Sequence, residues 1–258
     1  MSFIHESAIV SPKATIGADC YIGAFSTIGD EVILGDRVSL ESHVVIGGKT
    51  KIGDDTRIFP FVSIGLAPQD LKYGGEPTAT EIGKRNHLRE FVTVHRGTKG
   101  GGGLTKIGDD NLLMAQAHVA HDCQIGNEVI MANAATLAGH VEIADRANIG
   151  AYSGVHQFCR IGFEAFVGGY SVIVKDALPF AISQGNHARC FGLNRLGMKR
   201  RGYAKDTIEK LHHAYHLLLS AKLNTTQAVE KIKAEIKDCA EVDSLVEFIE
   251  TSKRGVVK

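Results

Sequence analysis

The stretch ATIGADCYIGAFSTIGDEVILGDRVSLESHVVI, residues 14–46, places a large aliphatic residue at every sixth position, often followed by glycine. The same series runs from Ile4 to Ile64 and resumes at Ile82. After a change of phase by one residue, it continues from Ile107 to Ile173. A regular period over so much of the chain is the mark of a repeat architecture, in which neighbouring repeats stack on a common core. The repeat therefore decides the fold.

A second position supports this repeat independently. Four residues after each aliphatic residue stands a small or β-branched one, such as Ala14, Val38 or Ser153. Each unit of six is one short strand and a corner, and three units close a triangular coil of about 18 residues, stacked at ~4.8 Å. The small positions point inward near the corners. Three of the five cysteines (Cys20, Cys123 and Cys159) occupy them, so we expect small core residues rather than redox groups.

Composition excludes several classes of protein. Lys plus Arg and Asp plus Glu are equal at 29 each, so no net charge favours nucleic acid. Apolar runs are too short for a membrane span, and residues 1–10 lack the pattern of an export signal. Five cysteines without a CxxC spacing indicate reduced thiols. We therefore expect a cytoplasmic protein that neither spans a membrane nor binds nucleic acid.

Two segments interrupt the repeat. Residues 66–81 replace three regular hexapeptides without changing the phase, as expected of a functional loop that leaves the coil and returns to the same corner. Residues 99–106, KGGGGLTK, lack the GK[ST] ending of a phosphate-binding loop and lead into a strand. We expect a mobile connector there. The β-helix with its two loops is predicted to span residues 1–185.

Residues 186–258 are predicted to form a linker and a small helical domain. Ile208, Leu211, Tyr215 and Leu218 share one helical face, with Asp206 as a possible cap. Two further helices are centred on residues 229–236 and 245–249. A helical domain of roughly 55 residues is marginal alone, so it should pack on the β-helix or on a neighbouring subunit. We interpret the histidines of residues 212–216 as surface or packing residues, and no metal site is predicted.

A column of polar residues singles out one edge of the β-helix. Residues 118–122 read His-Val-Ala-His-Asp, and steps of one coil from His121 reach Gly139 and Gln157. His140 and His156 stand beside these two positions. The column fits a solvated or interface row, a zinc site or a general base. Zinc-binding hexapeptide carbonic anhydrases use a His-x4-His pair, whereas the pair here is His118-x2-His121.

General base catalysis is the favoured interpretation, because imidazole titrates near neutrality and a carboxylate can orient it. Asp122 is the adjacent candidate for this carboxylate. Neighbouring residues of a strand point to opposite sides, however, so another histidine or another subunit could be the partner of His121 instead.

Seven segments spread along the chain resemble the UDP-N-acetylglucosamine acyltransferase family, and the similarity covers the whole length. They are Gln69–Tyr73 (QDLKY), Val94–Thr98 (VHRGT), Asp110–Met114 (DNLLM), Ala117–Asp122 (AHVAHD), Ala138–His140 (AGH), His156–Phe158 (HQF) and Gln184–His187 (QGNH). The resemblance implies a left-handed β-helix. It further implies a homotrimer with clefts between subunits, no cofactor, and transfer of a 3-hydroxyacyl chain from the phosphopantetheine of acyl carrier protein to the sugar 3-hydroxyl in lipid A biosynthesis.

The resemblance also implies residue roles. His121 matches the general base, and the backbone N–H of Gly139 matches the donor that stabilises the oxyanion. Matches to other substrate-contacting positions are Asp70, Lys72, His95, His118, His140, His156, Gln157, His187, Asn194, Arg200 and Arg201. The last three match positions near the nucleotide and its phosphates. Lys199–Arg201 is either a solvated charge run or an attractor of the pyrophosphate and of an acidic carrier protein.

Two positions refine this expectation. Gly169 matches the place where the family measures acyl length, and a missing side chain there implies a chain of about fourteen carbons rather than ten. Leu196 stands where some members carry an acidic residue, which leaves the phosphate-side network open. Three alternatives remain: an N-acyltransferase with a 3-amino sugar acceptor, a coenzyme A-dependent acetyltransferase, and a non-catalytic scaffold. The repeat begins at Ile4, without the domain that precedes the repeat in the N-acyltransferase, and the outward polar column disfavours a scaffold.

Overall fold

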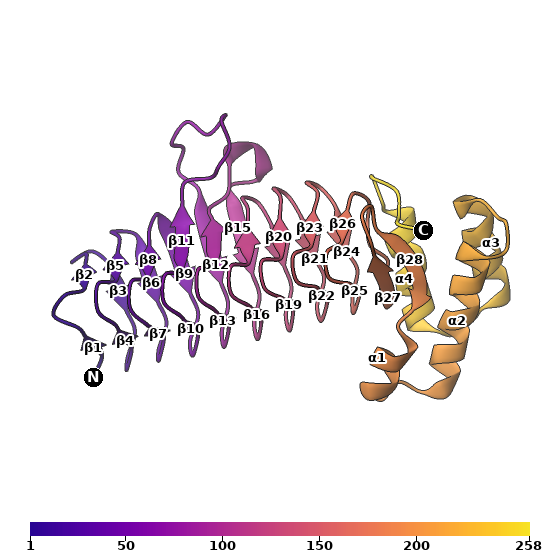
Figure 1. Cartoon of the computed structure of the whole chain (residues 1–258), viewed down its shortest axis with the longest axis horizontal. Helices are drawn as coiled ribbons and strands as arrows, with labels where there is room; N and C mark the ends of the chain where they lie inside the picture. The colour runs from indigo at the N-terminus through magenta and orange to yellow at the C-terminus, as the bar shows by residue number, and fades with distance from the viewer.

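The computed structural model describes all 258 residues. Short strands stack into three parallel sheets that wind along one axis as a left-handed parallel β-helix, and a small helical domain lies at the far end (Figure 1). The parallel β-helix was predicted from the period of six, and its left hand from the family resemblance. Both predictions are confirmed.

Each sheet collects every third strand of the β-helix. Sheet A contains β1 (Phe3–Ile4), β4 (Tyr21–Ile22), β7 (Ser39–Leu40), β10 (Arg57–Ile58), β13 (His87–Leu88), β16 (Leu112–Leu113), β19 (Ile130–Met131), β22 (Asn148–Ile149), β25 (Phe166–Val167), β27 (Ala181–Gln184) and β28 (Arg189–Leu193). Sheet B contains β2 (Ile9–Val10), β5 (Thr27–Ile28), β8 (Val45–Ile46), β11 (Ser63–Leu66), β14 (Thr93–His95), β17 (His118–Val119), β20 (Thr136–Leu137), β23 (Gly154–Val155) and β26 (Val172–Ile173). Sheet C contains β3 (Thr15–Ile16), β6 (Val32–Leu34), β9 (Lys49–Ile52), β12 (Ala79–Ile82), β15 (Leu104–Ile107), β18 (Gln124–Ile125), β21 (Glu142–Ile143) and β24 (Arg160–Ile161).

The chain passes from sheet A to B to C and back to A, so the prism has three edges, here named the AB, BC and CA edges. Strands of successive coils pair in register, as in His118↔Thr136↔Gly154 on sheet B. Residues one coil apart therefore lie directly above one another. Because of this register, outward side chains of successive coils form straight rows along the β-helix.

The interior of the prism is filled by the repeat itself. The aliphatic position of each unit is buried from Ile22 onward, and the position four residues later is buried beside it. The apolar residues at these positions belong to one core of 38 residues. Cys20, Cys123 and Cys159 belong to this core, as predicted. Burial raises the pKa of the Cys123 thiol to about 12, so this thiol stays protonated and unreactive.

One residue at most corners has a positive φ, as in Phe61 (φ 64°) and Asp122 (φ 59°). This conformation costs a non-glycine residue about 1 kcal/mol, and stacking between coils offsets part of that cost. The rings of Phe61 and Phe91 stack at the AB edge with their centroids 5.0 Å apart. The corner conformation thus aligns outward side chains in rows along the edges.

Both interruptions of the repeat cross the BC edge. The first runs from β11 to β12 and the second from β14 to β15, one coil further along, and Figure 1 shows them rising together from the same side. The first loop joins two different sheets and takes the place of one corner. The prediction that it replaces three hexapeptides and returns to the same corner is therefore wrong, because 64 to 82 is a single corner enlarged by two units. Leu66 and 79–81 belong to the flanking strands.

The regular coils end after β26, but sheet A continues through β27, which pairs with β25, and then turns back in the antiparallel β28. The helices that follow are α1 (Arg195–Arg200), α2 (Lys205–Leu219), α3 (Thr225–Glu235) and α4 (Ala240–Glu250). The last three were predicted, whereas β28 and the short α1 replace part of the expected linker. Asp206 is not a cap, because Ala204 holds the cap position and Asp206 lies in the first turn of α2. The division of the chain into domains at residue 185 stays a prediction.

The helices pack on the end of the β-helix through a second core that includes Leu178 and Phe180. Arg160 of β24 fastens this contact, since its guanidinium donates to the Phe248 carbonyl (2.7 Å) and pairs with the buried Asp176 carboxylate (3.1 Å). The helical tail therefore packs on its own β-helix, one of the two arrangements expected for it. None of the four helices is long and apolar enough to span a membrane.

A matched pair of leucines tests the energetic role of the stacked core. Leu113 is fully buried, whereas Leu71 is fully exposed in the first loop. We expect Leu113→Ala to lower the free energy of unfolding by about 2–5 kcal/mol, because it removes buried methyl groups and leaves a cavity. Leu71→Ala should change it by less than about 0.5 kcal/mol. Urea unfolding followed by circular dichroism measures both, and equal effects would contradict this account of the core.

Candidate active site

Three successive corners of the BC edge meet at the candidate site. The first two are the loops after β11 and β14, and the third carries His121 and Asp122 directly after β17. Strand β17 pairs with β14, so this corner lies one coil beyond the second loop. Two enlarged corners beside a regular one create a sheltered recess on an otherwise smooth prism. The position of the site thus follows from the register and from the two insertions.

His121 and Asp122 form a hydrogen-bonded pair. The His121 Nδ1 atom lies 2.8 Å from Asp122 Oδ2, and the Asp122 side chain is fully buried. Two neighbours in a strand would point apart, but Asp122 has a left-handed corner conformation that directs its carboxylate back towards the imidazole. The adjacent residue is therefore the carboxylate partner, and neither another histidine nor another subunit is needed. An Nδ1–H donor to Asp122 leaves Nε2 as a free acceptor, as a general base requires.

The second loop holds the Asp122 carboxylate from outside. Thr98 donates its backbone N–H to Oδ1 (2.9 Å) and its hydroxyl to Oδ2 (2.6 Å). Residues Lys99–Gly101 form a 3-10 turn that lies against the same carboxylate. The connector expected at 99–106 thus contains a packed 3-10 turn, and its last three residues belong to β15, while its mobility stays a prediction. Its glycines serve close packing, because a Cβ at Gly101 would lie 2.1 Å from the Asp122 Cγ.

Gly139 lies directly above His121, one coil further along the edge. A Cβ at this position would lie 2.5 Å from His121 Cε1 and 2.7 Å from Nε2, so only glycine fits beside the imidazole. The Gly139 N–H donates to no acceptor in the chain, and its carbonyl accepts from the N–H of Phe158. A free backbone donor thus stands next to the free nitrogen of the candidate base. The predicted column of His121, Gly139 and the residues beside it is present.

Three further histidines surround this pair in an environment that favours their neutral form. Burial, reinforced by the nearby His95 and His121, lowers the pKa of His118 to about 4. Burial also lowers the pKa of His95 and of His140. His118 shares a 2.6 Å hydrogen bond with Thr93 Oγ1, and the His140 ring stacks on Phe158. These imidazoles are suited to hydrogen bonding a substrate without taking its proton.

A cleft of about 540 Å³ runs over sheet B from His95, His118 and His121. Polar side chains of Gln69, His95 and His118 line its lower part, and His156 lies higher, beside Val155. Its upper part is formed by Gly154, Val155, Val172 and Val174. Gln157 is exposed at the BC edge above Gly139 and does not line the cleft. The cleft therefore joins a polar end at His121 to an apolar end two coils further along.

The first loop brings Asp70 and Lys72 to the polar end. Asp70 accepts the backbone N–H of Lys72 (2.9 Å), and its charge acts on His140. Arg96 anchors the loop, since its Nε donates to the Tyr73 hydroxyl at 2.8 Å and a terminal nitrogen donates to the Gly65 carbonyl at 3.2 Å. Asp70 thus lies near the histidine cluster, and Lys72 follows it in the same turn.

Two predicted site residues lie outside the cleft. Gly169 is at the AB edge, where a Cβ would lie 3.3 Å from the Ala151 carbonyl oxygen. His187 is exposed in the turn between β27 and β28. Within one chain neither residue lines the cleft that holds His121.

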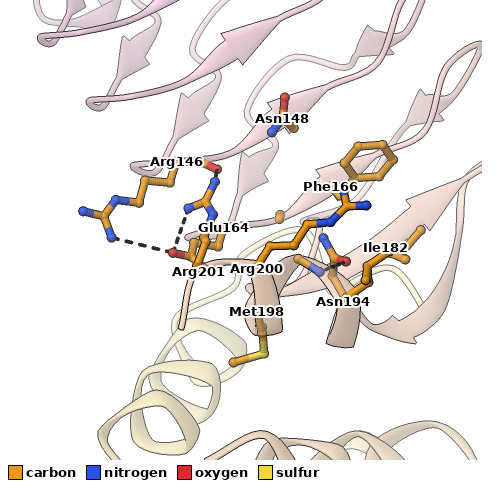
Figure 2. A pocket seen from close by; sticks show the side chains of 12 residues that line it. Arg146, Asn148, Glu164, Phe166, Ile182, Asn194, Met198, Arg200 and Arg201 are labelled. Atoms are coloured by element: carbon orange, nitrogen blue, oxygen red, sulfur yellow. Dashed lines mark hydrogen bonds and ion pairs between the residues drawn. The ribbon is translucent and has the colours of Figure 1, made fainter. Parts of the chain in front are cut away.

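A second pocket of about 400 Å³ contains the predicted nucleotide-side residues (Figure 2). It lies on sheet A and the CA edge, beside Asn148 and Phe166. Arg201 donates to Glu164 Oε1 at 2.7 Å, and Arg146 converges on the same carboxylate, whereas Figure 2 shows Arg200 extending towards Phe166. Of the basic run Lys199–Arg201, Arg201 is therefore already paired.

The N-terminal end of α1 completes this pocket. Asn194 caps the helix, because its Oδ1 accepts the N–H of Gly197 at 2.9 Å. Leu196 is exposed in the same pocket. Sheet B carries the first cleft and sheet A the second pocket, so one chain does not bring His121 and Arg200 together.

Comparisons with known proteins agree with this arrangement. The model of the bacterial hexapeptide transferase repeat matches residues 13–48 and 104–139, and the model of UDP N-acetylglucosamine O-acyltransferase, domain 2, matches residues 176–257. LpxA from Acinetobacter baumannii is 45% identical, with a TM-score of 0.97 and 99% of each chain covered. LpxA from Bacteroides fragilis, a UDP-N-acetylglucosamine acyltransferase, is 38% identical over 99% of this chain and 100% of its own, with a TM-score of 0.97. The Francisella novicida UDP-N-acetylglucosamine acyltransferase is 37% identical over 99% of this chain and 94% of its own, with a TM-score of 0.96.

The chain belongs to the UDP-N-acetylglucosamine acyltransferase family. The enzyme is thus an acyltransferase, and the alternative of a non-catalytic scaffold is wrong. In this acyltransferase the histidine cluster lies on sheet B and the basic pocket lies on sheet A.

The acyltransferase also contains one group of residues with metal-ligating atoms. His121, Asp122 and His140 place such atoms within 4.8 Å of one another, but His118, part of the zinc pattern weighed above, is not among them. Both Asp122 oxygens already accept hydrogen bonds from Thr98, and Oδ2 is also bonded to His121. This donor set fits an oriented base better than a metal ligand set.

Several residues of the acyltransferase site escaped the sequence analysis. Thr93 lies 25 residues before His118 and Thr98 lies 24 before Asp122, and both separations include the insert in the second loop. A step of 18 residues therefore missed both contacts. Counting the insert of seven residues as part of one corner would have placed Thr93 directly below His118.

The pKa of His118 predicts a pH dependence of stability. Its pKa is about 4 in the folded acyltransferase and about 6.5 in an unfolded chain. Below about pH 6.5 the unfolded chain gains a proton that the folded protein does not, so stability falls as the pH drops towards about 4. We expect His118→Asn to lose less stability over this window than the wild type. Urea unfolding between pH 7.5 and 4.5 measures the difference, and identical pH slopes would contradict a neutral His118.

Proposed function

We propose that this acyltransferase transfers a 3-hydroxyacyl chain from acyl carrier protein to the 3-hydroxyl of UDP-N-acetylglucosamine, the first step of lipid A biosynthesis. The observation that carries the proposal is the His121–Asp122 pair beside the free N–H of Gly139. Deprotonation of an alcohol and stabilisation of an oxyanion are the two tasks of acyl transfer. The relatives described as UDP-N-acetylglucosamine acyltransferases support the choice of acceptor.

The proposed reaction needs no covalent intermediate on the enzyme. His121 Nε2 takes the proton of the sugar hydroxyl while its oxygen attacks the thioester carbonyl, and the buried Asp122 stabilises the resulting imidazolium. The Gly139 N–H donates to the oxyanion of the tetrahedral intermediate. Collapse of this intermediate breaks the carbon–sulfur bond, and the imidazolium returns its proton to the phosphopantetheine thiol. No resident cofactor is required.

The polar residues around His121 suit the sugar. Neutral His95, His118 and His140 can donate or accept hydrogen bonds without competing with His121 for the proton. Asp70 and Lys72 approach from the anchored loop. We assign these residues to acceptor binding, with His156 and Gln157 at the upper border of the polar end.

The apolar end of the cleft suits the acyl chain. The outward side chains of Val172 and Val174 continue the cleft along sheet B, away from His121. Gly169 stands at the AB edge on the coil that leads into Val172, where a longer side chain would narrow the path between packed subunits. A glycine at this place favours a chain of about fourteen carbons, since each methylene in such a pocket changes affinity by about 1 kcal/mol.

The surface of the prism favours a homotrimer. The outward face of sheet B carries no charged side chain, whereas that of sheet C carries Lys51, Glu81, Lys106, Glu142 and Arg160. At the AB edge, aromatic residues including Phe61, Phe91, Tyr152 and Tyr170 are exposed and stacked in rows. Exposed apolar rows of this kind mark an interface. Three prisms that share an axis at their AB edges would place sheet B of each against sheet A of the next.

This packing would unite the two halves of the site. Asn148 begins the same coil that continues into Gly154, so the second pocket lies at the level of the apolar end of the cleft, about 10 Å from His118 along the axis. Arg200 of one subunit would then face the cleft of its neighbour and could meet the pyrophosphate. Asn194 would serve the nucleotide, while Arg201 orients Glu164 and Arg146. His187 belongs to the same neighbouring surface.

Two variants of the reaction remain as alternatives, a 3-amino acceptor and a coenzyme A donor. The same base and oxyanion donor would serve either one, so the choice depends on the product. An acidic carrier protein fits the basic run Lys199–Arg201. A cytoplasmic location, where this carrier is found, stays a prediction.

A product assay tests the reaction. The purified enzyme is mixed with UDP-N-acetylglucosamine and acyl carrier proteins that bear 3-hydroxyacyl chains of different lengths, and mass spectrometry detects the acylated nucleotide sugar. We expect a maximum near about fourteen carbons and a fall of ~10²–10⁴-fold in turnover for His121→Ala with the assembly intact. Near-normal turnover of this variant would refute the base. Product only from a 3-amino sugar or from acyl-coenzyme A would select an alternative.

A mixing experiment tests the shared site. His121→Ala and Arg200→Ala disable opposite halves, so each should be poorly active alone. Unfolding and refolding the two variants together should restore activity, because some clefts of the mixed trimers combine an intact His121 with an intact Arg200 of the neighbour. Sedimentation equilibrium should give about three times the chain mass of 27.7 kDa. Arg195→Ala, which affects only a surface pair with Glu209, is the control. A monomer, or no recovery in the mixture, would exclude this assembly.

A further inference from the structure

The buried carboxylate of Asp122 is held by a turn, Gly97–Gly101, to which neither the family resemblance nor the proposed mechanism assigns a role. We propose that Thr98 is a positioning residue for the catalytic base, and that Gly97–Gly101 form a cap that fixes the Asp122 carboxylate behind His121. The inference rests on the proposed function, since it concerns the base of that reaction. It assigns a role to the glycine-rich second loop.

Thr98 donates hydrogen bonds to both oxygens of the Asp122 carboxylate, including the one that His121 contacts. Its N–H donates to Oδ1 at 2.9 Å, and its hydroxyl donates to Oδ2 at 2.6 Å, the same oxygen that lies 2.8 Å from His121 Nδ1. The hydroxyl therefore fixes how Oδ2 is presented to the imidazole. Hydrogen bonds to a buried charged group are among the stronger ones in proteins, and loss of one partner leaves that charge poorly satisfied.

The glycines of the turn allow this close approach. A Cβ at Gly101 would lie 2.1–2.5 Å from three atoms of the Asp122 carboxyl group. A Cβ at Gly97 would lie 2.3 Å from the backbone nitrogen of Leu104 and 2.8 Å from Asp122 Oδ1. Side chains at either position would push the turn away from the carboxylate. The turn thus excludes water from Asp122, whose side chain is fully buried.

Asp122 is also fixed from the inside of the prism. Its N–H donates to the hydroxyl of Thr105, which is fully buried in β15. Thr98 and Thr105 stand at the two ends of the second loop. The loop therefore hydrogen bonds both to the side chain of Asp122, through Thr98, and to its backbone, through Thr105. A carboxylate held in this way can only accept hydrogen bonds, and it selects the His121 tautomer with the proton on Nδ1. The free Nε2 is then aimed at the substrate.

Kinetics of Thr98 variants test the proposal with the complete enzyme and the carrier-bound donor. Thr98→Val keeps the shape and the backbone N–H but removes the hydroxyl, so we expect kcat to fall by about 10-fold or more while KM stays within about twofold. Thr98→Ser restores the hydroxyl and should return kcat to within about threefold of the wild type. Gly101→Ala should lower kcat in the same way as Thr98→Val.

Thr80→Val is the matched control. Thr80 is fully buried in β12 beside Thr105, but its hydroxyl has no hydrogen-bond partner, so the same substitution should leave kcat unchanged. Circular dichroism and sedimentation verify that each variant folds and assembles. If Thr98→Val fails to fold, Thr98→Ala carries the same expectation, because it only removes atoms.

A second measurement does not depend on turnover. Nitrogen-15 spectra of the histidine rings, with His121 assigned by its loss in His121→Ala, report which ring nitrogen carries the proton. We expect Nδ1–H in the wild type and a mixed or reversed tautomer in Thr98→Val. An unchanged tautomer together with unchanged kcat would overturn the proposal while leaving the reaction intact. If the wild type forms no product, the proposed function fails, and the tautomer alone decides whether Thr98 positions His121.

Discussion

In-register stacking of each coil on the next is the constraint from which the rest of this structure follows. The aliphatic residue of each unit can be buried only when it lies above its counterpart, so the core locks the register. The same register then aligns residues that have no part in the core, such as His121 and Gly139 at the BC edge. A catalytic arrangement can therefore be built on the outside of the prism from residues whose spacing is set by the inside.

Corner conformation decides which neighbours meet within this frame. The positive φ of Asp122 turns its carboxylate towards His121, although strand geometry would separate the two side chains. Glycine at position 139 leaves room for the imidazole in the next coil. The candidate active site thus depends on a backbone conformation that recurs at most corners of the β-helix. The candidate site differs from other corners in its residues: an aspartate at position 122 and a glycine at position 139.

The sequence was sufficient to predict the β-helix, the helical tail and the column containing His121. The spacing of the aliphatic residues shows the period of six, and three such units give the length of one coil. The sequence was insufficient where insertions change the distance between neighbours, as for Thr98 and Asp122, which are 24 residues apart yet in direct contact. It also did not reveal the contacts of the glycine-rich loop with Asp122, because flexibility and close packing favour the same residue. The contact partner of each glycine appears only in three dimensions.

The proposed division of the site between two subunits has a physical reason. A prism of stacked coils is convex along every edge, so a single chain offers shallow grooves rather than an enclosed pocket. Deep burial of a nucleotide sugar and an acyl chain needs a second wall. The uncharged face of sheet B and the aromatic rows of the AB edge can supply it by packing against sheet A of a neighbour, at the level where Arg200 and Asn194 lie. In the proposed trimer, catalysis on a large substrate and self-association would draw on the same surfaces.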